Sequence, residues 1–482
     1  MSDLIISVSG LRGKVGSGLT AMLATEYASA YGTFLGGGKV IVGRDSRPSG
    51  AMLAQAVMAG LASAGCNPLD IGLAATPTCG LLVKQLGTAG GVEISASHNP
   101  SEWNGMKLFH RDGRVLNGSE AEEVKSIFES KKFAVCRWDE VGRPSRYGDP
   151  HAAHLTRVLA VVDAEAIRRR SFHVVLDSNH GVGGILGSRL LSALGCRVTA
   201  LGGTPDGAFD HPPEPLPENL IAVCRAVRDS QAHIGFAQDP DADRLAIVDE
   251  TGRAIGEELT ITLAAHHFLA KRPGLVVVNL STTRAVEDAA AARGSKCERT
   301  AVGEANVVER MLKKNAVLGG EGNGGVILPQ VVHVRDSFSG MALILEAMAL
   351  HEAPVSLLVR RLPQYFMIKD KVEVDPAKLP AVLRKLSTRQ KDASPNLADG
   401  LRLDWPDRWL HVRASNTEPI ARIIAEAKTE PAARELIAQA RGMLGVAIVK
   451  PRTTKAKSGV KRARPVRPAK RPSRGKAAKA KR

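Results

Sequence analysis

Aromatic residues and long apolar runs are both scarce in this chain. Phe, Trp and Tyr make up 4% of its 482 residues, and no run reaches the roughly 18 apolar residues that a membrane-spanning helix needs. The amino terminus, Met1-Ser2-Asp3-Leu4, has neither a basic flank nor a long apolar segment. We therefore expect no membrane span, no secretory signal and a cytoplasmic protein.

Paired cysteine motifs and the common nucleotide-binding loop are missing as well. The six cysteines are spread along the chain with no Cys-x-x-Cys pair, which favours reduced thiols over a disulfide framework or a zinc site. No Gly-x-x-x-x-Gly-Lys-Ser/Thr segment occurs, so nothing indicates a nucleotide bound by a P-loop.

Acidic residues are absent from segment 450–482, which contains fifteen Lys and Arg residues. Removing those fifteen charges from the formal total of +17 leaves +2 for residues 1–449, so the body is nearly neutral. Because the segment has few apolar residues to bury, residues 448–482 are predicted to be a disordered basic tail. Such a tail can bind DNA, RNA or another polyanion weakly and in a salt-dependent way; a solubilising tail is the alternative.

Strand and helix patterns alternate through most of the chain, which predicts mixed sheets with helices on both faces. Three such units are expected, at 1–148, 149–252 and 253–364. From about Tyr365 the order changes to a smaller unit at 365–447. The predicted fold class is α/β, with three consecutive α/β domains and a smaller C-terminal α+β domain around a central cleft.

Two local features of the first unit are predicted from short patterns. Residues 4–13 favour a short strand that leads into a loop, Ser9-Gly10-Leu11-Arg12-Gly13. The glycines there would let the Arg12 guanidinium reach an anion, although a solvated turn arginine is the plainer alternative. Ser49 is expected to cap a helix over Gly50 to Ala64.

A short apolar strand is expected to bring a serine, a histidine and a lysine together. The run Val92-Glu93-Ile94 is β-prone, and Asn99-Pro100 ends any regular element because proline fixes φ and lacks an N–H. Ser97 should therefore lie in a loop at the carboxyl end of a strand, where open α/β sheets bind ligands. His98 is adjacent and Lys107 follows ten residues later. The alternative is an Asn-Pro turn with a capping serine.

Three carboxylates at alternate positions form the second strong signal, at Asp239, Asp241 and Asp243. They would repel one another unless a cation lies among them, and hard oxygen ligands of this kind suit Mg²⁺. An EF-hand would place Glu250 at its twelfth position, but Arg244 stands at the sixth, where that motif needs glycine. The flanks also favour strands over helices. A solvated acidic turn is the remaining alternative.

Two further loops carry polar groups suited to a phosphorylated sugar. The glycine-dense segment 319–325 contains Glu321 and Asn323, an acceptor and a donor that can grip adjacent hydroxyls; a glycine-rich hairpin is the alternative. The other segment gathers a guanidinium, two hydroxyls and an amide, which suit a phosphate dianion unless the loop is merely polar. Its residues are Arg413, Ser415, Asn416 and Thr417.

In their residues and in their order along the chain, these four loops resemble the signature loops of the α-D-phosphohexomutases. The resemblance covers residues 1–445 and includes Gly43-Arg-Asp-Ser-Arg-Pro-Ser-Gly50 and Thr300-Ala-Val-Gly-Glu304. The segment Val8–Gly16 and the run Asn323-Gly-Gly325 are most similar to the archaeal-type phosphoglucosamine mutase branch. Asn323 departs from many members, which have serine there.

The resemblance implies an isomerase that interconverts glucosamine 6-phosphate and glucosamine 1-phosphate through a phosphoserine. It implies a phosphorylated Ser97, one Mg²⁺ per chain, and a hexose 1,6-bisphosphate as intermediate and activator. By resemblance, Ser97, Asp239, Asp241 and Asp243 hold the metal, and Ser97, His98, Lys107 and Arg12 are catalytic, with Lys107 as candidate general acid/base. The implied substrate-binding residues are Arg244, Glu321, Asn323, Arg413, Ser415, Asn416 and Thr417.

Several alternatives stay open at this point. Asn323 leaves phosphomannomutase or phosphoglucomutase activity possible within the same class. A polyanion-binding role of residues 450–482 belongs to another class and can coexist with catalysis. The expected partner is a phosphosugar, and the chain is expected to be a monomer or a homodimer.

Overall fold

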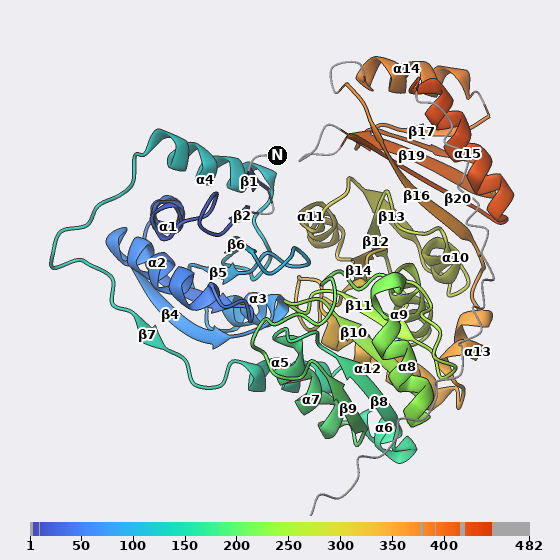
Figure 1. Cartoon of the computed structure of the whole chain (residues 1–482), viewed down its shortest axis with the longest axis horizontal. Coiled ribbons are helices and arrows are strands. Elements are labelled where there is room, and N and C mark those ends of the chain that lie inside the picture. Colours follow the sequence, from blue (N-terminus) through green and yellow to red (C-terminus); the bar gives the residue numbers. More distant parts are fainter. Residues whose placement is uncertain (1–2, 9, 376–378, 391, 415–419, 446–482) are drawn as a thin grey trace, which may run out of the picture. The chain divides into compact units, whose positions relative to one another are not determined.

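The computed structural model describes residues 3–8, 10–375, 379–390, 392–414 and 420–445 (Figure 1). The predicted basic tail and the predicted phosphate-binding residues Ser415, Asn416 and Thr417 lie outside these residues. Within the described ranges, no helix has both the length and the hydropathy to cross a bilayer. The described chain forms four β-sheets.

The first sheet has seven strands in the order β1-β2-β6-β5-β3-β4-β7, of which β3, β4, β5 and β7 pair in parallel and the others antiparallel. Its strands are β1 (Leu4–Ser7), β2 (Gly10–Lys14), β3 (Gly38–Arg44), β4 (Cys66–Leu73), β5 (Gly90–Ile94), β6 (Trp103–His110) and β7 (Ser145–Arg146). Its helices are α1 (Ala21–Leu35), α2 (Gly50–Ser63), α3 (Thr76–Gln85) and α4 (Gly118–Ser130). Val40 and Val42 join a core with residues of α1, α2 and α4, whereas Ile41 joins a core with residues of α3. Successive side chains of a strand point to opposite faces, so both faces of this sheet are covered by helices.

The second sheet has four strands in the order β11-β10-β8-β9, with only β11 antiparallel to its neighbour. Its strands are β8 (His173–Asp177), β9 (Arg197–Leu201), β10 (Ile234–Gln238) and β11 (Leu245–Val248). The helices of this part are α5 (His151–Leu159), α6 (Ala164–Arg170), α7 (Gly183–Ala193), the 3-10 turn η1 (Pro217–Asn219) and α8 (Ile221–Ser230).

The third sheet repeats this pattern in the order β13-β12-β14-β15, with β15 antiparallel to β14. Its strands are β12 (Val276–Asn279), β13 (Cys297–Thr300), β14 (Leu318–Glu321) and β15 (Gly325–Ile327). The helices are α9 (Glu258–Lys271), α10 (Ala285–Ala291), α11 (Glu304–Lys314), α12 (Ser337–Leu350) and α13 (Val355–Arg360).

The fourth sheet is antiparallel throughout, in the order β16-β20-β19-β18-β17. Its strands are β16 (Phe366–Glu373), β17 (Ser394–Asn396), β18 (Leu401–Asp404), β19 (Arg408–Ala414) and β20 (Ile420–Ala427), and its helices are α14 (Leu379–Arg389) and α15 (Glu430–Met443). It has an apolar core of its own, which includes Leu401, Ile423 and Leu436.

One apolar core is shared by the first three sheets. It contains Ile41 of β3, Phe236 of β10 and Val278 of β12. It also contains helix α12, whose residues 337–349 are all buried. A helix that is apolar around its circumference has to be buried. Helix α12 therefore lies at the centre of the shared core, and the loop between β10 and β11 packs against its first residue.

The predicted multi-domain α/β fold class is confirmed, while the domain boundaries and the central cleft stay predictions. Two local predictions are wrong. Residues 10–13 belong to strand β2, because Gly10 (φ 101°) lets the Met106 carbonyl of β6 approach where a Cβ would overlap it. The Ser49 side chain does not cap α2; it accepts a hydrogen bond of 2.9 Å from Asn104 Nδ2.

Candidate active site

Ser97 lies in a loop directly after the buried strand β5, which we call the serine loop (Ser95–Pro100). The residue is 1% exposed and has a φ of 50°, in the left-handed region that non-glycine residues rarely adopt. Its N–H donates to Ser95 Oγ at 2.8 Å, and Ser95 Oγ donates to Asp45 Oδ2 at 2.7 Å. This chain of hydrogen bonds holds the turn at Ser97.

Arg47 binds the backbone of the serine loop through hydrogen bonds. It was not among the site residues predicted from the sequence. Its Nη2 donates to the carbonyl oxygens of Ser97, at 2.7 Å, and Asn99. Asp45 pairs with the same guanidinium, and the ring centroid of Phe209 lies 5.2 Å from its Cζ. Strained backbone persists only where its surroundings enforce it. Arg47 lies in the segment 43–50, which resembles the α-D-phosphohexomutases, and this resemblance is the sequence feature that could have identified it.

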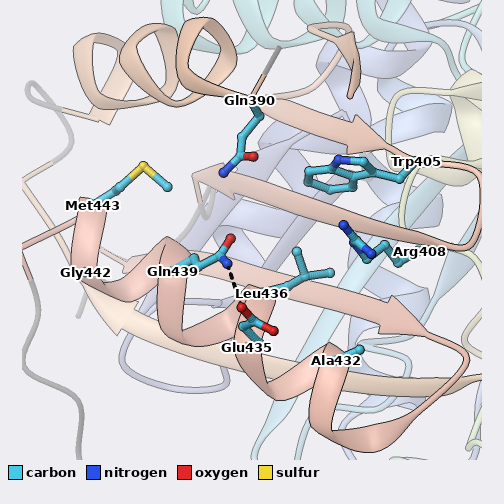
Figure 2. Close-up of a pocket in the computed structure, with 9 residues that line it drawn as sticks. All are labelled: Gln390, Trp405, Arg408, Ala432, Glu435, Leu436, Gln439, Gly442 and Met443. Carbon is cyan, nitrogen blue, oxygen red and sulfur yellow. Dashed lines mark hydrogen bonds between the residues drawn. The ribbon is translucent and has the colours of Figure 1, made fainter. Parts of the chain in front are cut away.

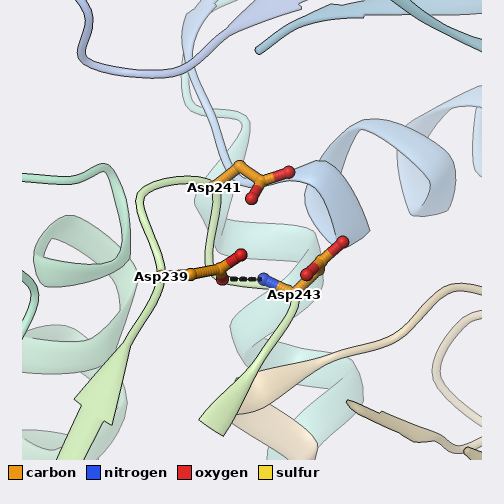
Figure 3. A group of neighbouring side chains, drawn as sticks. All are labelled: Asp239, Asp241 and Asp243. Atoms are coloured by element: carbon orange, nitrogen blue, oxygen red, sulfur yellow. Dashed lines mark hydrogen bonds between the residues drawn. The ribbon is translucent and has the colours of Figure 1, made fainter. Parts of the chain in front are cut away.

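The three aspartates predicted as metal ligands lie in the loop between β10 and β11, the aspartate loop (Asp239–Arg244). One carboxylate oxygen from each lies within 4.8 Å of the others (Figure 3). Asp239 Oδ1 accepts hydrogen bonds from the N–H groups of Asp243 at 3.1 Å and Arg244 at 3.0 Å, which closes the turn. The flanking elements are strands, so an EF-hand is excluded.

The charges of the aspartate loop are unevenly balanced. Burial and the carboxylates of Asp243 and Asp241 raise the pKa of Asp239 well above its usual range. Burial also acts against ionised Asp241 and Asp243, but the cations beside them outweigh it and lower both pKa values.

Two buried oxygens, Oδ1 of Asp241 and Oδ1 of Asp243, have no hydrogen-bond donor among the described residues. Unpaired buried anions are costly. A set of hard carboxylate oxygens with unpaired buried members has the chemistry of a divalent-cation site.

The serine and aspartate loops meet. Ser97 Oγ donates to Asp239 Oδ2 at 3.0 Å, although the two residues are 142 positions apart in the chain. His98 Nδ1 lies 3.4 Å from the same Oγ. The geometry therefore brings a hydroxyl, an imidazole and a carboxylate cluster together.

Lys107 projects from β6 into the aspartate loop. Its Nζ pairs with Asp241 Oδ2 and, at 3.0 Å, with Asp243 Oδ2, and it donates to Thr76 Oγ1 at 3.3 Å. Burial lowers the pKa of this ammonium, but the two aspartates outweigh burial and raise it above its usual value. Lys107 is therefore a charged partner of the loop at neutral pH.

Two further predicted residues, Arg12 and Arg244, lie close to the serine loop and influence His98 within it. Arg12 of β2 donates from Nη1 to Asn99 Oδ1 at 3.3 Å. Arg244 pairs with Glu214 at 3.1 Å, and its Nε lies 4.0 Å from Asp239 Oδ2. The charge of Arg244, burial and the charge of Arg12 hold the pKa of His98 well below its usual range, so the imidazole is neutral.

Glu321 lies in the predicted glycine-dense segment, here called the glycine loop (Gly319–Gly325), between β14 and β15. Its Oε1 accepts from Asn279 Nδ2 at 2.7 Å and from the N–H of Gly303 at 3.2 Å. Its Oε2 accepts from Arg335 and, at 3.4 Å, from Asn323 Nδ2. All four acceptor directions of this carboxylate therefore have a protein donor.

The glycine at position 322 is a steric requirement. An ideal Cβ there would overlap the carboxylate of Glu258 on α9. Glu258 is held by Lys369 of β16 at 2.9 Å and by the N–H of Thr283 at 3.0 Å, so it cannot move aside freely. The glycine loop is therefore packed closely against the Glu258 side chain of α9 at Gly322.

Arg413 is placed apart from the other predicted residues. It lies near the end of β19, and its Nε pairs with Asp399 Oδ2 at 2.9 Å. The same oxygen accepts from the N–H of Val302 at 3.1 Å. Among the described residues, no hydrogen bond or ion pair joins Arg413 to the serine or aspartate loop.

A hollow in the described chain is lined by none of the residues of these loops (Figure 2). It has a volume of about 540 Å³ and lies on the fourth unit. Its lining residues are Gln390, Trp405, Arg408, Ala432, Glu435, Leu436, Gln439, Gly442 and Met443. Its lining contains a single carboxylate, that of Glu435, and no cluster comparable to the one at the serine and aspartate loops.

Comparison with known proteins gives matches along most of the chain. The models of phosphoglucomutase/phosphomannomutase α/β/α domains I, II and III match residues 4–135, 149–252 and 256–366, and that of the C-terminal domain matches 368–443. A phosphoglucomutase/phosphomannomutase of Thermococcus kodakarensis is 38% identical over 437 residues, which are 89% of this chain and 95% of that protein.

A probable phosphoglucosamine mutase of the same organism is 36% identical over 445 residues, 91% of this chain and 98% of the relative. The crystal structure of a phosphoglucomutase/phosphomannomutase family protein from Burkholderia thailandensis superimposes with a TM-score of 0.82 at 28% identity, covering 91% of this chain and 96% of that one. Sequence and fold agree over nearly the full length of these proteins. The chain therefore belongs to the phosphoglucomutase/phosphomannomutase family within the α-D-phosphohexomutase superfamily, and it is a mutase close to the phosphoglucosamine mutases.

Proposed function

We propose that this phosphohexomutase is a phosphoglucosamine mutase, which interconverts glucosamine 6-phosphate and glucosamine 1-phosphate. The observation that carries the proposal is the contact of Ser97 Oγ with Asp239, 3.0 Å apart, inside a cluster of three buried carboxylates. A serine hydroxyl beside a candidate metal site suits phosphoryl transfer, where positioning and charge stabilisation do most of the work. The probable phosphoglucosamine mutase among the relatives supports the choice of sugar.

The residues that would hold the metal are Asp239, Asp241 and Asp243, together with a phosphoryl oxygen on Ser97. We take the ion to be Mg²⁺, since carboxylate and phosphate oxygens are its preferred ligands. Bound there, Mg²⁺ would offset the negative charge that builds up on the transferring phosphoryl group. The unpaired Oδ1 atoms of Asp241 and Asp243 support this assignment.

The reaction begins with a phosphorylated Ser97. The bond between Oγ and phosphorus breaks while a free hydroxyl of the sugar monophosphate forms a new bond to phosphorus. That hydroxyl gives its proton to a base, and the released Ser97 oxygen takes up a proton. The product is a 1,6-bisphosphate. After this intermediate turns over, the Ser97 hydroxyl takes the other phosphoryl group and gives up its proton, and the sugar oxygen that is released gains one.

The cations around Ser97 are assigned by what they touch. Lys107, bound to Asp241 and Asp243, is the candidate for proton transfer to or from the sugar oxygen. Because its pKa is raised, it carries a proton at neutral pH and is assigned as the donor to the oxygen that is released. Arg12 and His98 flank the transferring group, and Arg244 steadies the aspartate loop.

The sugar is assigned to the glycine loop and the second phosphate to Arg413 with Ser415, Asn416 and Thr417. Since every acceptor direction of Glu321 is used, a sugar hydroxyl has to displace one donor. Asn323 Nδ2, at 3.4 Å, is the most distant of them and the one expected to leave. Asn323 thereby becomes a second sugar ligand. The domain boundaries 1–148, 149–252, 253–364 and 365–447 are proposed with the same division of roles.

Phosphomannomutase or phosphoglucomutase activity is the second candidate function. The observation in its favour is the 38% identical relative that carries both of those names. Both candidates use the same serine and aspartate loops and differ only in the preferred sugar, so the substrate decides between them.

The test combines a variant with a substrate panel. Ser97→Ala should abolish most turnover and keep the fold, and intact-protein mass should show one phosphoryl group on the wild type and none on the variant. Ser101→Ala, in the neighbouring turn, is the matched control and should keep both. Comparison of kcat/KM for the glucosamine, glucose and mannose phosphates should favour glucosamine. Full turnover by Ser97→Ala would overturn the mechanism, and a preference for mannose or glucose would overturn the choice of sugar.

A further inference from the structure

Arg335 joins two loops that no sequence pattern linked to it. Its Nη2 pairs with Asp243 Oδ2 of the aspartate loop at 2.7 Å. Its Nη1 pairs with Glu321 Oε2 of the glycine loop. The third carboxylate near it is that of Glu304, at 3.6 Å from Nη2. The guanidinium therefore spans from a candidate metal ligand to the candidate sugar ligand.

The backbone that carries Arg335 is firmly seated. Its N–H donates to Glu304 Oε1 at 2.7 Å. The next residue, Asp336, caps the buried helix α12 by accepting from the N–H groups of Phe338 and Ser339, at 3.0 and 3.2 Å. Ser337 then donates to the carbonyl of Ala242 in the aspartate loop at 2.7 Å. Arg335 thus directly precedes the buried helix α12, whose first residue contacts the aspartate loop.

The arginine fork is suited to this bridge. A guanidinium is planar and presents several N–H groups in fixed directions, so it can bind two carboxylates at once with a defined distance between them. An ammonium is a compact point charge and cannot reproduce that spacing. Arg335 is 8% exposed, and buried charge pairs of this kind are strong when both partners are present and costly when one is removed.

We propose that Arg335 is a positioning residue that acts through Glu321 and sets the sugar-binding carboxylate at a fixed place relative to the aspartate loop. This inference rests on the proposed function, because it takes Glu321 as a sugar ligand. Its consequence is that the sugar hydroxyl is aligned with the phosphoryl group on Ser97. Without the bridge, Glu321 takes a range of positions, so the sugar binds more weakly and in several orientations.

The first test separates sugar binding from metal binding. Arg335→Gln should raise the KM for the sugar phosphate about tenfold or more, since a displaced Glu321 binds the sugar hydroxyls less well, and it should also lower kcat because the bound sugar is misplaced. Mn²⁺ affinity, measured by electron paramagnetic resonance on the purified enzyme, should stay equal or become tighter, because a cation beside Asp243 has been removed. A variant that merely destabilises the fold would weaken both. Parallel weakening of sugar and metal binding, or an unchanged KM, would overturn the proposal.

Two further variants guard against misfolding. Arg335→Lys keeps the charge beside Asp243 and should bind Mn²⁺ as the wild type does, while its KM for sugar stays raised. Arg114→Gln is the matched control, because Arg114 also pairs with two carboxylates, those of Asp112 and Glu120, and its side chain is 12% exposed against 10% for Arg335. It should leave both constants unchanged. A wild-type KM in Arg335→Lys would overturn the requirement for the fork.

The second test asks whether the effect passes through Glu321. Glu321→Gln should lower kcat/KM, and adding Arg335→Gln to it should lower kcat/KM no further, within a factor of about two. Fully additive losses would show that Arg335 acts by another route. If Glu321→Gln has no effect on sugar binding, the proposed role of Glu321 falls, and this inference with it. If only Arg335→Gln lacks an effect, the inference alone falls.

Discussion

Lys107 and Arg335 donate to the same atom, Oδ2 of Asp243, at 3.0 and 2.7 Å. One residue comes from β6 and the other from the segment before α12, so the two cations reach the aspartate loop from different parts of the fold. Together they offset the repulsion among three buried carboxylates. Loss of either cation should therefore leave Asp243 with less positive charge beside it.

Replacement of Lys107 tests its role in proton transfer. Lys107→Met should lower kcat by about a hundredfold or more, because positioned proton transfer contributes about 10²–10⁴ to a rate. The measurement is steady-state turnover of the sugar phosphate. Lys14→Met, at a lysine whose side chain is 43% exposed, is the control and should behave as the wild type. Full turnover by Lys107→Met would refute the role.

Removal of metal should abolish activity reversibly. A chelator should stop turnover and added Mg²⁺ should restore it. Asp241→Asn should weaken Mn²⁺ binding by about a hundredfold or more, since even outer-shell partners cost about 10–100-fold. Asp249→Asn, a buried aspartate outside the loop, serves as the matched control. Equal Mn²⁺ affinity in the wild type and Asp241→Asn would contradict a metal site at this loop.

Weakening the support of the serine loop should lower turnover without touching the metal. Arg47→Gln removes the donor to the carbonyls of Ser97 and Asn99, and a misplaced Ser97 should cost about tenfold to a hundredfold in kcat. Mn²⁺ affinity should be unchanged. Arg441→Gln, which breaks a pair with Asp370 on the fourth unit, is the control. Normal kcat in Arg47→Gln would show that the serine loop keeps its conformation without the Arg47 hydrogen bonds.

A buried carboxylate on α12 should make stability depend on pH. Burial raises the pKa of Glu346, but the hydrogen bonds from His267 and Lys271 outweigh it and bring the pKa to about 2. Since this pKa is lower in the folded chain than the usual 4.5, the stabilisation is present above pH 4.5 and is lost as the pH falls toward 2.

Glu346→Gln should therefore lower the free energy of unfolding by about 3 kcal/mol at pH 7. Its deficit relative to the wild type should shrink as the pH is lowered below 4.5, as measured by denaturant unfolding at several pH values. Glu352→Gln, at a nearby glutamate whose side chain is 77% exposed, is the control and should show little effect at any pH. A deficit that is the same at pH 7 and pH 3 would contradict this account.

Some parts of the site were predictable because their chemistry lies within a few residues. The Asp239–Asp243 spacing indicated a cation, and the strand before Ser97 indicated a serine in a loop at the carboxyl end of that strand, without any knowledge of the fold. Arg335 and Arg47 could not be predicted in this way, because each is defined by contacts with distant residues. The cap expected from Ser49 failed for the same reason, since Asn104 competes for its side chain.

The sequence by itself determined the alternation of strands and helices, the change of architecture near Tyr365, and the nature of the reactive groups, because local periodicity and short motifs encode them. Tertiary structure alone decided that Ser97 meets Asp239, that two cations share Asp243, and that Glu321 is tied to the aspartate loop through Arg335. These contacts depend on how the sheets pack around α12. A buried charged group pairs with an opposite charge that is close in space, and sequence separation does not determine which groups are close.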